Sequence, residues 1–140
     1  MSQTGMAPGR EAEDDARPRF YHEVFDFHVD AEKRLVTVKF GKKVSAEEIV
    51  GYAAALRTHE AFEPTFSEIV DLRETEELDL EADDFLHLAD RVDPFSEQAK
   101  RAFAVRTSTQ NHAARMHKIL RGQSIAIFES LEEAEAWIRS

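Results

Sequence analysis

The chain has 140 residues, no cysteine and a formal net charge of −10. This length fits one domain around a single core, and the lack of cysteine excludes a disulfide, a thiol nucleophile and a cysteine-ligated metal or iron–sulfur centre. The acidic charge argues against nucleic acid as a partner, because phosphates would be repelled. The sequence shows no signal peptide and no apolar run as long as a membrane helix. We therefore expect a cytoplasmic protein with no stable membrane insertion.

The N-terminal residues 1–19 are predicted to be a disordered tail, because they are rich in glycine, proline and charge and have almost no large apolar side chain. One folded domain is expected over residues 20–140. Phe20 opens the folded part, and Phe25, Phe27 and Val29 alternate with Asp26 and His28 as in a half-buried strand. A turn at 30–33 leads into a second strand over 35–40.

The first helix has a clear start signal, because Ser45 and Glu48 form a capping-box pair before apolar residues at helical spacing. A short strand is expected over 69–72. An acidic loop follows, and a second helix carries apolar residues from Phe85 to Val92 on one face. The pair Asp93-Pro94 is expected to end this helix.

Two more strand–helix pairs complete the chain. Strands are expected over 102–105 and 125–128, and Thr107 or Ser108 is expected to cap the helix between them. The side chains of that helix predicted to face the core are Met116, Ile119 and Leu120. Gly122 is predicted to end the helix in a left-handed conformation. Ser130 with Glu133 is expected to start a terminal helix.

This element order predicts an α/β fold of order ββαβαβαβα, with four helices and a mixed, largely parallel five-stranded sheet. Strands that alternate with helices favour right-handed crossovers and parallel pairing. The first hairpin would supply an antiparallel edge.

Charge is sorted by sign along the chain. Residues 74–97 carry ten acids and one base, whereas residues 98–122 carry six bases and no acid. Such segregation indicates two faces of opposite potential and a charged partner. Most of the bases are expected to face solvent, namely Lys100, Arg101, Arg115, Lys118 and Arg121, and His112 and His117 are expected at the surface or flank of their helix.

No catalytic residue, cofactor site or metal site is predicted. The sequence has no glycine-rich phosphate loop, dinucleotide fingerprint, zinc-protease helix motif or nucleophile elbow. His87 has Asp83 and Asp84 one helical turn before it, but in so acidic a segment we interpret them as solvated charge. The chain is therefore expected not to be an enzyme.

The start of the third helix is a candidate anion site. Arg106, Thr107, Ser108 and Thr109 lie where a strand ends and a helix begins, and helix amides, hydroxyls and a guanidinium together bind anions. Open parallel sheets also bind ligands at the carboxyl ends of their strands. Ordinary helix capping explains the same residues and is the simpler interpretation.

The element order over residues 20–140 and one motif resemble the SpoIIAA-like, or STAS-type, domains, which include the bacterial anti-sigma factor antagonists. In that family a strand ends in Asp-Leu, and eight residues after its aspartate comes a hydrophobic-Asp pair that leads into Ser-Ser-Gly. Asp71-Leu72 and Leu78-Asp79 match these pairs at the same separation, but residues 80–82 are Leu-Glu-Ala.

This departure bears on regulation, because the family's phosphorylated serine falls on Glu81. A glutamate cannot be phosphorylated and carries about one negative charge where phosphoserine carries roughly 1.5 to 2. The chain thus resembles the uncharacterised single-domain branch of the superfamily more than the true antagonists. Thr75 lies in an acidic context that fits a phosphorylation site, but an ordinary loop threonine is the simpler interpretation.

The resemblance implies a regulatory or protein-interaction domain that docks a protein partner through the acidic loop. The predicted partner-binding residues are Arg73, Glu74, Glu76, Glu77, Asp79 and Glu81. The alternative is a protein of the same fold that binds a small lipid or phosphorylated ligand, with some of the ten phenylalanines lining a pocket; core packing explains most of them. A homodimer through faces of opposite charge is a further alternative.

Overall fold

The computed structural model describes residues 25–122 and 124–140. Its elements are β1 (Phe25–Asp30), β2 (Leu35–Phe40), β3 (Lys43–Ser45), α2 (Ala46–Arg57), β4 (Ser67–Asp71), β5 (Glu77–Asp79), α3 (Ala82–His87), η1 (Leu88–Val92), β6 (Arg101–Ala104), α4 (Ser108–Arg121), β7 (Ile125–Phe128) and α5 (Leu131–Arg139). The predicted tail, residues 1–19, and the predicted strand start at Phe20 lie outside the described residues.

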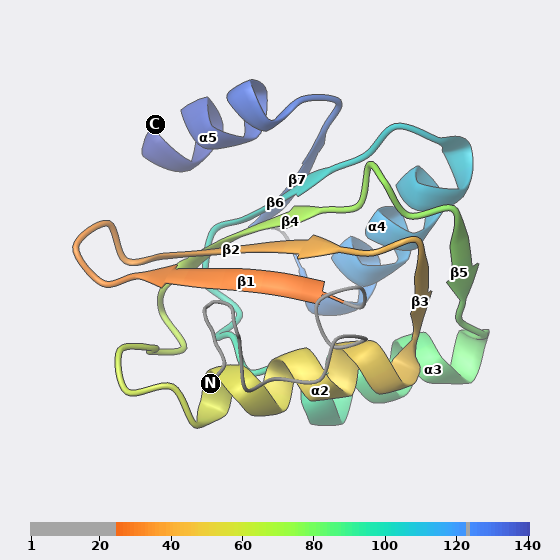
Figure 1. Cartoon of the computed structure of the whole chain (residues 1–140), viewed down its shortest axis with the longest axis horizontal. Helices are drawn as coiled ribbons and strands as arrows, with labels where there is room; N and C mark the ends of the chain where they lie inside the picture. The colour runs from red at the N-terminus through yellow and green to blue at the C-terminus, as the bar shows by residue number, and fades with distance from the viewer. Residues whose placement is uncertain (1–24, 123) are drawn as a thin grey trace, which may run out of the picture.

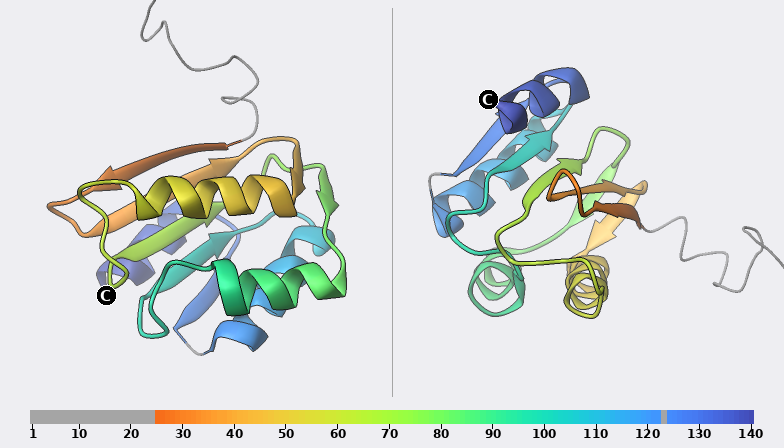
Figure 2. Two further views of the ribbon diagram at one scale, coloured as in Figure 1. Left: turned by 90° about the horizontal axis from the view of Figure 1, so that it is seen from below. Right: turned by 90° about the vertical axis from the view of Figure 1, so that its left-hand side faces the viewer.

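The five-stranded sheet has the strand order β1-β2-β4-β6-β7, in which only the β1–β2 pair is antiparallel (Figure 1). The helices α2, α3 with its π-helical continuation η1, and α4 lie on one face, and α5 lies on the other (Figures 1 and 2). This arrangement confirms the predicted α/β fold class. None of the helices described is long and apolar enough to cross a membrane.

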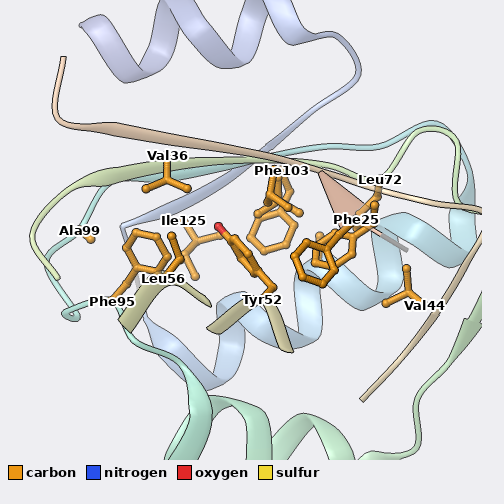
Figure 3. Packing of buried hydrophobic residues seen from close by; sticks show 14 of the residues in the cluster. Phe25, Val36, Val44, Tyr52, Leu56, Leu72, Phe95, Ala99, Phe103 and Ile125 are labelled. Atoms are coloured by element: carbon orange, nitrogen blue, oxygen red, sulfur yellow. The ribbon is translucent and has the colours of Figure 1, made fainter. Parts of the chain in front are cut away.

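The main core lies between the sheet and the three helices on its first face. Tyr52 packs edge-on against Phe25, Phe27 and Phe40, with ring centroids 5.8 to 6.0 Å apart. Leu56 and Phe103 complete the centre of this cluster (Figure 3). A separate cluster on the other face joins α5 to the sheet. Most phenylalanines in the described residues therefore serve the packed core, as the sequence predicted.

The predicted acidic loop contains a strand that the sequence did not reveal. Residues Glu77–Asp79 form β5, which pairs in parallel with β3 in a small two-stranded sheet. Leu78 is half-buried and packs on the main core, while Glu77 and Asp79 on either side of it are exposed. This alternation stabilises an extended segment even though its composition is acidic.

The inward face of α4 differs from the prediction. Ile119 is 75% exposed, and the buried side chains are those of Gln110, Ala113 and Ala114. Met116 and Leu120 are half-buried. Small residues allow α4 to pack closely on the sheet, so the larger isoleucine lies on the outer face.

The predicted helix ends are confirmed. Ser45 begins α2, with its N–H donating to Glu48 Oε1 at 2.6 Å. Thr107 caps α4, because its hydroxyl oxygen accepts from the Gln110 N–H at 3.1 Å. Gly122 ends that helix with φ 113°, a left-handed conformation that favours glycine.

Candidate functional site

Exposed carboxylates gather where β4, β5 and α3 meet, at one end of the molecule. We call Glu74, Glu76, Glu77, Asp79, Glu81 and Asp83 the acidic surface; all six residues are exposed. Glu74 lies 2.9 Å from Lys39 and Glu77 lies 3.8 Å from Lys43. Within the described residues no ion pair neutralises the other four, so the surface is strongly negative.

Arg73, which the sequence assigned to the partner-binding set, is turned toward its own chain. Its guanidinium donates to both carboxylate oxygens of Asp71, at 3.0 and 3.1 Å. Its carbonyl accepts from Arg106 Nε at 2.9 Å. Burial alone raises the pKa of the Asp71 carboxyl, but the hydrogen bonds and charge of Arg73 outweigh it and hold that pKa below its usual range. Arg73 thus fixes the turn that presents the acidic surface.

Glu81 and Thr75 have local structural roles. Glu81 occupies the N-cap position of α3, where its N–H donates to Asp84 Oδ2 at 2.8 Å. The position that resembles the phosphoserine site therefore begins a helix. Thr75 is 2% exposed, and its hydroxyl donates to the Gly41 carbonyl at 2.8 Å. A hydroxyl buried in this way is closed to a kinase.

The predicted anion site at the start of α4 is largely occupied by the protein's own groups. Gln110 Oε1 accepts from the Arg106 N–H at 2.6 Å and from the Thr107 N–H at 3.2 Å. The Arg106 guanidinium is bound to the Arg73 carbonyl. Ser108 and Thr109 remain exposed. Together with the exposed Arg106, whose guanidinium has a partner only at Nε among the described residues, these two residues are what the helix start still offers to an anion, and the anion site stays a prediction.

An apolar cavity of about 100 Å³ lies between the sheet and the helices α2, α3 and η1. Aliphatic and aromatic side chains line most of it, among them Phe40, Val70, Phe85, Leu88 and Phe103. Cavities lined in this way stay dry, and one of roughly 150 Å³ admits a benzene-sized molecule. At about 100 Å³ the cavity is smaller than that, so a ring enters only if its walls move, and as it stands it has room for a few carbon atoms of an apolar chain.

A buried ionic network forms the polar wall of this cavity. Asp93 Oδ2 lies 2.6 Å from Arg101 Nη1, 3.1 Å from His117 Nε2 and 3.0 Å from Arg121 Nε. Arg101 Nε also donates to Glu68 Oε1 at 2.9 Å. These groups tie η1, β4, β6 and α4 together beneath the helices.

Tyr52 extends the network into α2, because its hydroxyl donates to Glu68 Oε2 at 2.6 Å. Burial, followed by the charge of Glu68, raises the pKa of the Tyr52 hydroxyl well above its usual value. Burial by itself would also raise the pKa of Asp93. The hydrogen bond from His117 and the charge of Arg101 reverse that effect, so the pKa of Asp93 lies well below its usual range.

The sequence did not predict this network. Arg101 is 6% exposed and the Arg121 side chain is 16% exposed, so the expectation that both face solvent was wrong. His112 is exposed and His117 is half-buried, on the flank of its helix. A weak signal existed, because His117 and Arg121 share the α4 face of Ala113 and Ala114 at helical spacing. Within the described residues no group of three His, Asp or Glu side chains is placed to bind a metal ion.

No protein-family model and no curated protein matches the chain. Among solved structures, the fold is similar to that of an uncharacterized protein from the DUF3478 family, with a SpoIIAA-like fold, from Shewanella loihica. The TM-score is 0.59 at 18% sequence identity, and the match covers 82% of this chain and 94% of the other. At this low sequence identity the match establishes the fold alone and gives no information about ligands or partners. The comparison confirms what the element order indicated, and the fold of this chain is SpoIIAA-like.

Proposed function

We propose that this chain is a non-enzymatic interaction module that docks a basic protein partner on its acidic surface. The observation that carries the proposal is the set of six exposed carboxylates, of which only Glu74 and Glu77 lie near a base in the described residues. Complementary charge accelerates encounter and rejects partners of the wrong sign. Association through this surface should therefore depend on salt.

The location of the acidic surface supports the same function. It lies at the carboxyl end of β4 and the start of α3, where the SpoIIAA-like domains that the chain resembles contact their partners. Glu81 stands at the position of their regulated serine and carries a fixed charge. Docking would then be constitutive, because no phosphate can be added or removed at that residue.

Charge reversal with a matched control tests this function. The variant Glu76→Lys, Glu77→Lys and Asp79→Lys is compared with Glu32→Lys, Glu60→Lys and Glu135→Lys, which reverses three exposed acids elsewhere and changes the net charge equally. In crosslinking pull-downs from the source organism, the first variant should lose a basic partner that the second retains. Equal recovery by both variants would refute docking on this surface.

The apolar cavity favours a second candidate function, the binding of a small apolar ligand. Its lining is almost wholly hydrocarbon, and helix α3, which covers it, buries none of its own residues fully. Because α3 buries little apolar surface, its displacement requires little free energy and would admit a short apolar chain or ring.

Native mass spectrometry after gentle purification tests the second candidate. A bound apolar molecule, or a mass shift on adding short-chain fatty acids, is expected for the unmodified protein. The variant Ala113→Met fills the cavity wall and should abolish the shift, whereas Ala136→Met, on the exposed side of α5, should not. A clean apo mass under all conditions would contradict ligand binding.

A further inference from the structure

We infer that the open edge of β7, with the groove between it and α4, binds an extended acidic segment of a partner protein as an added strand. This surface is separate from the acidic surface and has the opposite charge. The inference is therefore independent of the function proposed above.

The backbone of β7 supplies the first element. β7 is the last strand in the sheet order, and it pairs only with β6 within the described residues (Figure 2). The Arg101 N–H donates to the Ser124 carbonyl and the Val105 N–H to the Phe128 carbonyl, each at 2.9 Å. Because alternate residues of a strand point their N–H and C=O groups to opposite sides, those of Ile125 and Ile127 point outward. They form a template for one more strand.

Apolar side chains beside this edge supply the second element. The groove between α4 and β7 is lined by Ile119, Ile127 and Phe128. Ile119 is 75% exposed, and the other two are half-buried. In strand addition, main-chain hydrogen bonds hold the peptide and neighbouring pockets select its alternate side chains. Ile119 and Ile127 would contact apolar side chains on one face of the added strand, whereas the Phe128 ring packs against Trp137 on the α5 face of the sheet.

Charge supplies the third element and selects the partner. Arg115 and Lys118 line the groove, and neither has an ion-pair partner among the described residues. Glu129 lies at the other end of the groove, beyond the end of β7. Acidic side chains are therefore favoured opposite the two bases and disfavoured near Glu129. Because the two bases lie on α4, on the same side as Ile119 and Ile127, the pattern fits an extended segment whose acidic and apolar residues share one face, at every second position.

The same bases argue against a second copy of this chain as the occupant. Antiparallel β7–β7 pairing about a two-fold axis would place both α4 helices on the same face of the joined sheet, next to the axis. Arg115 and Lys118 of the two copies would then face one another. Such like-charge contacts disfavour the symmetric dimer relative to an acidic strand.

Binding of short fluorescent peptides tests the inference directly. We expect a peptide with valine and glutamate at alternate positions of one face and threonine between them to bind the full chain, and the same peptide with glutamine in place of glutamate to bind roughly tenfold more weakly. Two further peptides carry N-methyl groups on the odd-numbered or on the even-numbered residues. Only one of them should lose binding, because only one set of alternate N–H groups points toward β7. Hydrogen exchange should slow at the amides of Ile125 and Ile127 when the peptide binds.

Protein variants locate the site. Arg115→Glu with Lys118→Glu should lower affinity roughly tenfold, whereas Lys33→Glu with Arg139→Glu, an equal charge change on exposed residues elsewhere, should leave it unchanged. Ile119→Asp removes an exposed contact without touching the core and should also weaken binding. No peptide binding, equal binding of both peptides, or a concentration-dependent dimer that protects the β7 amides would overturn the inference.

Discussion

Asp93 is the residue on which the buried network depends. One of its carboxylate oxygens lies within 3.1 Å of nitrogen atoms from Arg101, His117 and Arg121, and its other oxygen accepts from the Phe95 N–H at 3.0 Å. Its side chain is 2% exposed. Removing this carboxylate would leave Arg101 with Glu68 alone and would take from Arg121 the one carboxylate that it contacts among the described residues.

Asp93→Ala should therefore lower the free energy of unfolding by about 3 to 5 kcal/mol. The matched control is Asp90→Ala, three residues earlier, where the side chain is 76% exposed and pairs with exposed Arg91. Its loss should stay below about 1 kcal/mol. Urea unfolding monitored by circular dichroism measures both values, and similar losses would show that Asp93 is not central to the network.

The lowered pKa of Asp93 also fixes the sign of a pH dependence. Because its folded pKa lies below the unfolded value of about 3.9, its stabilisation is complete above that pH and is lost as pH falls toward the folded pKa. Urea unfolding of the native chain should show stability falling below about pH 4. Asp93→Asn should have a shallower slope over this range, and an unchanged slope would contradict the assignment.

Sequence alone could not reveal this network, because its members are far apart along the chain and each resembles ordinary surface charge. Glu68 and Arg101 are 33 residues apart, and Asp93 and His117 are 24 apart. Only the folded sheet brings them together. Arg101 is buried and Arg121 is half-buried, so the basic stretch leaves less exposed positive charge than its composition suggested.

At the scale of elements, Gln110 joins the start of α4 to the turn that carries the acidic surface. It is fully buried; its Oε1 accepts two backbone N–H groups, and its Nε2 donates to the Thr75 carbonyl at 2.7 Å. Sequence reasoning found the Thr107 cap but not this connection. The cap is a local signal, whereas the bond to Thr75 spans 35 residues.

Gln110→Ala should lower the free energy of unfolding by about 2 to 3 kcal/mol, because it removes the side-chain half of the capping box and leaves the backbone groups that Gln110 binds unpaired. Ser108→Ala, at the exposed first position of the same helix, should cost less than about 0.5 kcal/mol. Thermal or urea unfolding compares the two. A small loss for Gln110→Ala would show that water replaces these bonds and that the side chain does not brace the turn.

The elements themselves were largely predictable, because capping residues and apolar periodicity are local signals. Two features were not. Strand β5 has three residues, two of them acidic, and forms because β3 is available to pair with it. Ile119 lies on the outer face of α4 because the helix packs on the sheet through its alanines. The short distance between helix and sheet, and not the hydrophobicity of each side chain, decides which residues face inward.

At the scale of the whole molecule, the sorting of charge becomes two surfaces on different elements. The acidic surface spans β5 and the start of α3, and the exposed bases Arg115 and Lys118 lie on α4 beside the open sheet edge. The sequence predicted the existence of both surfaces. It did not predict the groove at β7, which needs the strand order.

Site-specific photo-crosslinking reports where a partner contacts the chain, so it distinguishes docking on the acidic surface from docking elsewhere. A photoreactive amino acid is placed at Glu76 in the acidic surface and, in a control protein, at Glu135 on α5; both residues are exposed. The predicted result is a crosslink to a basic protein from position 76 alone, which fades as salt rises from about 0.05 to 0.5 M. The same products from both positions, or a yield that salt does not change, would contradict docking on the acidic surface.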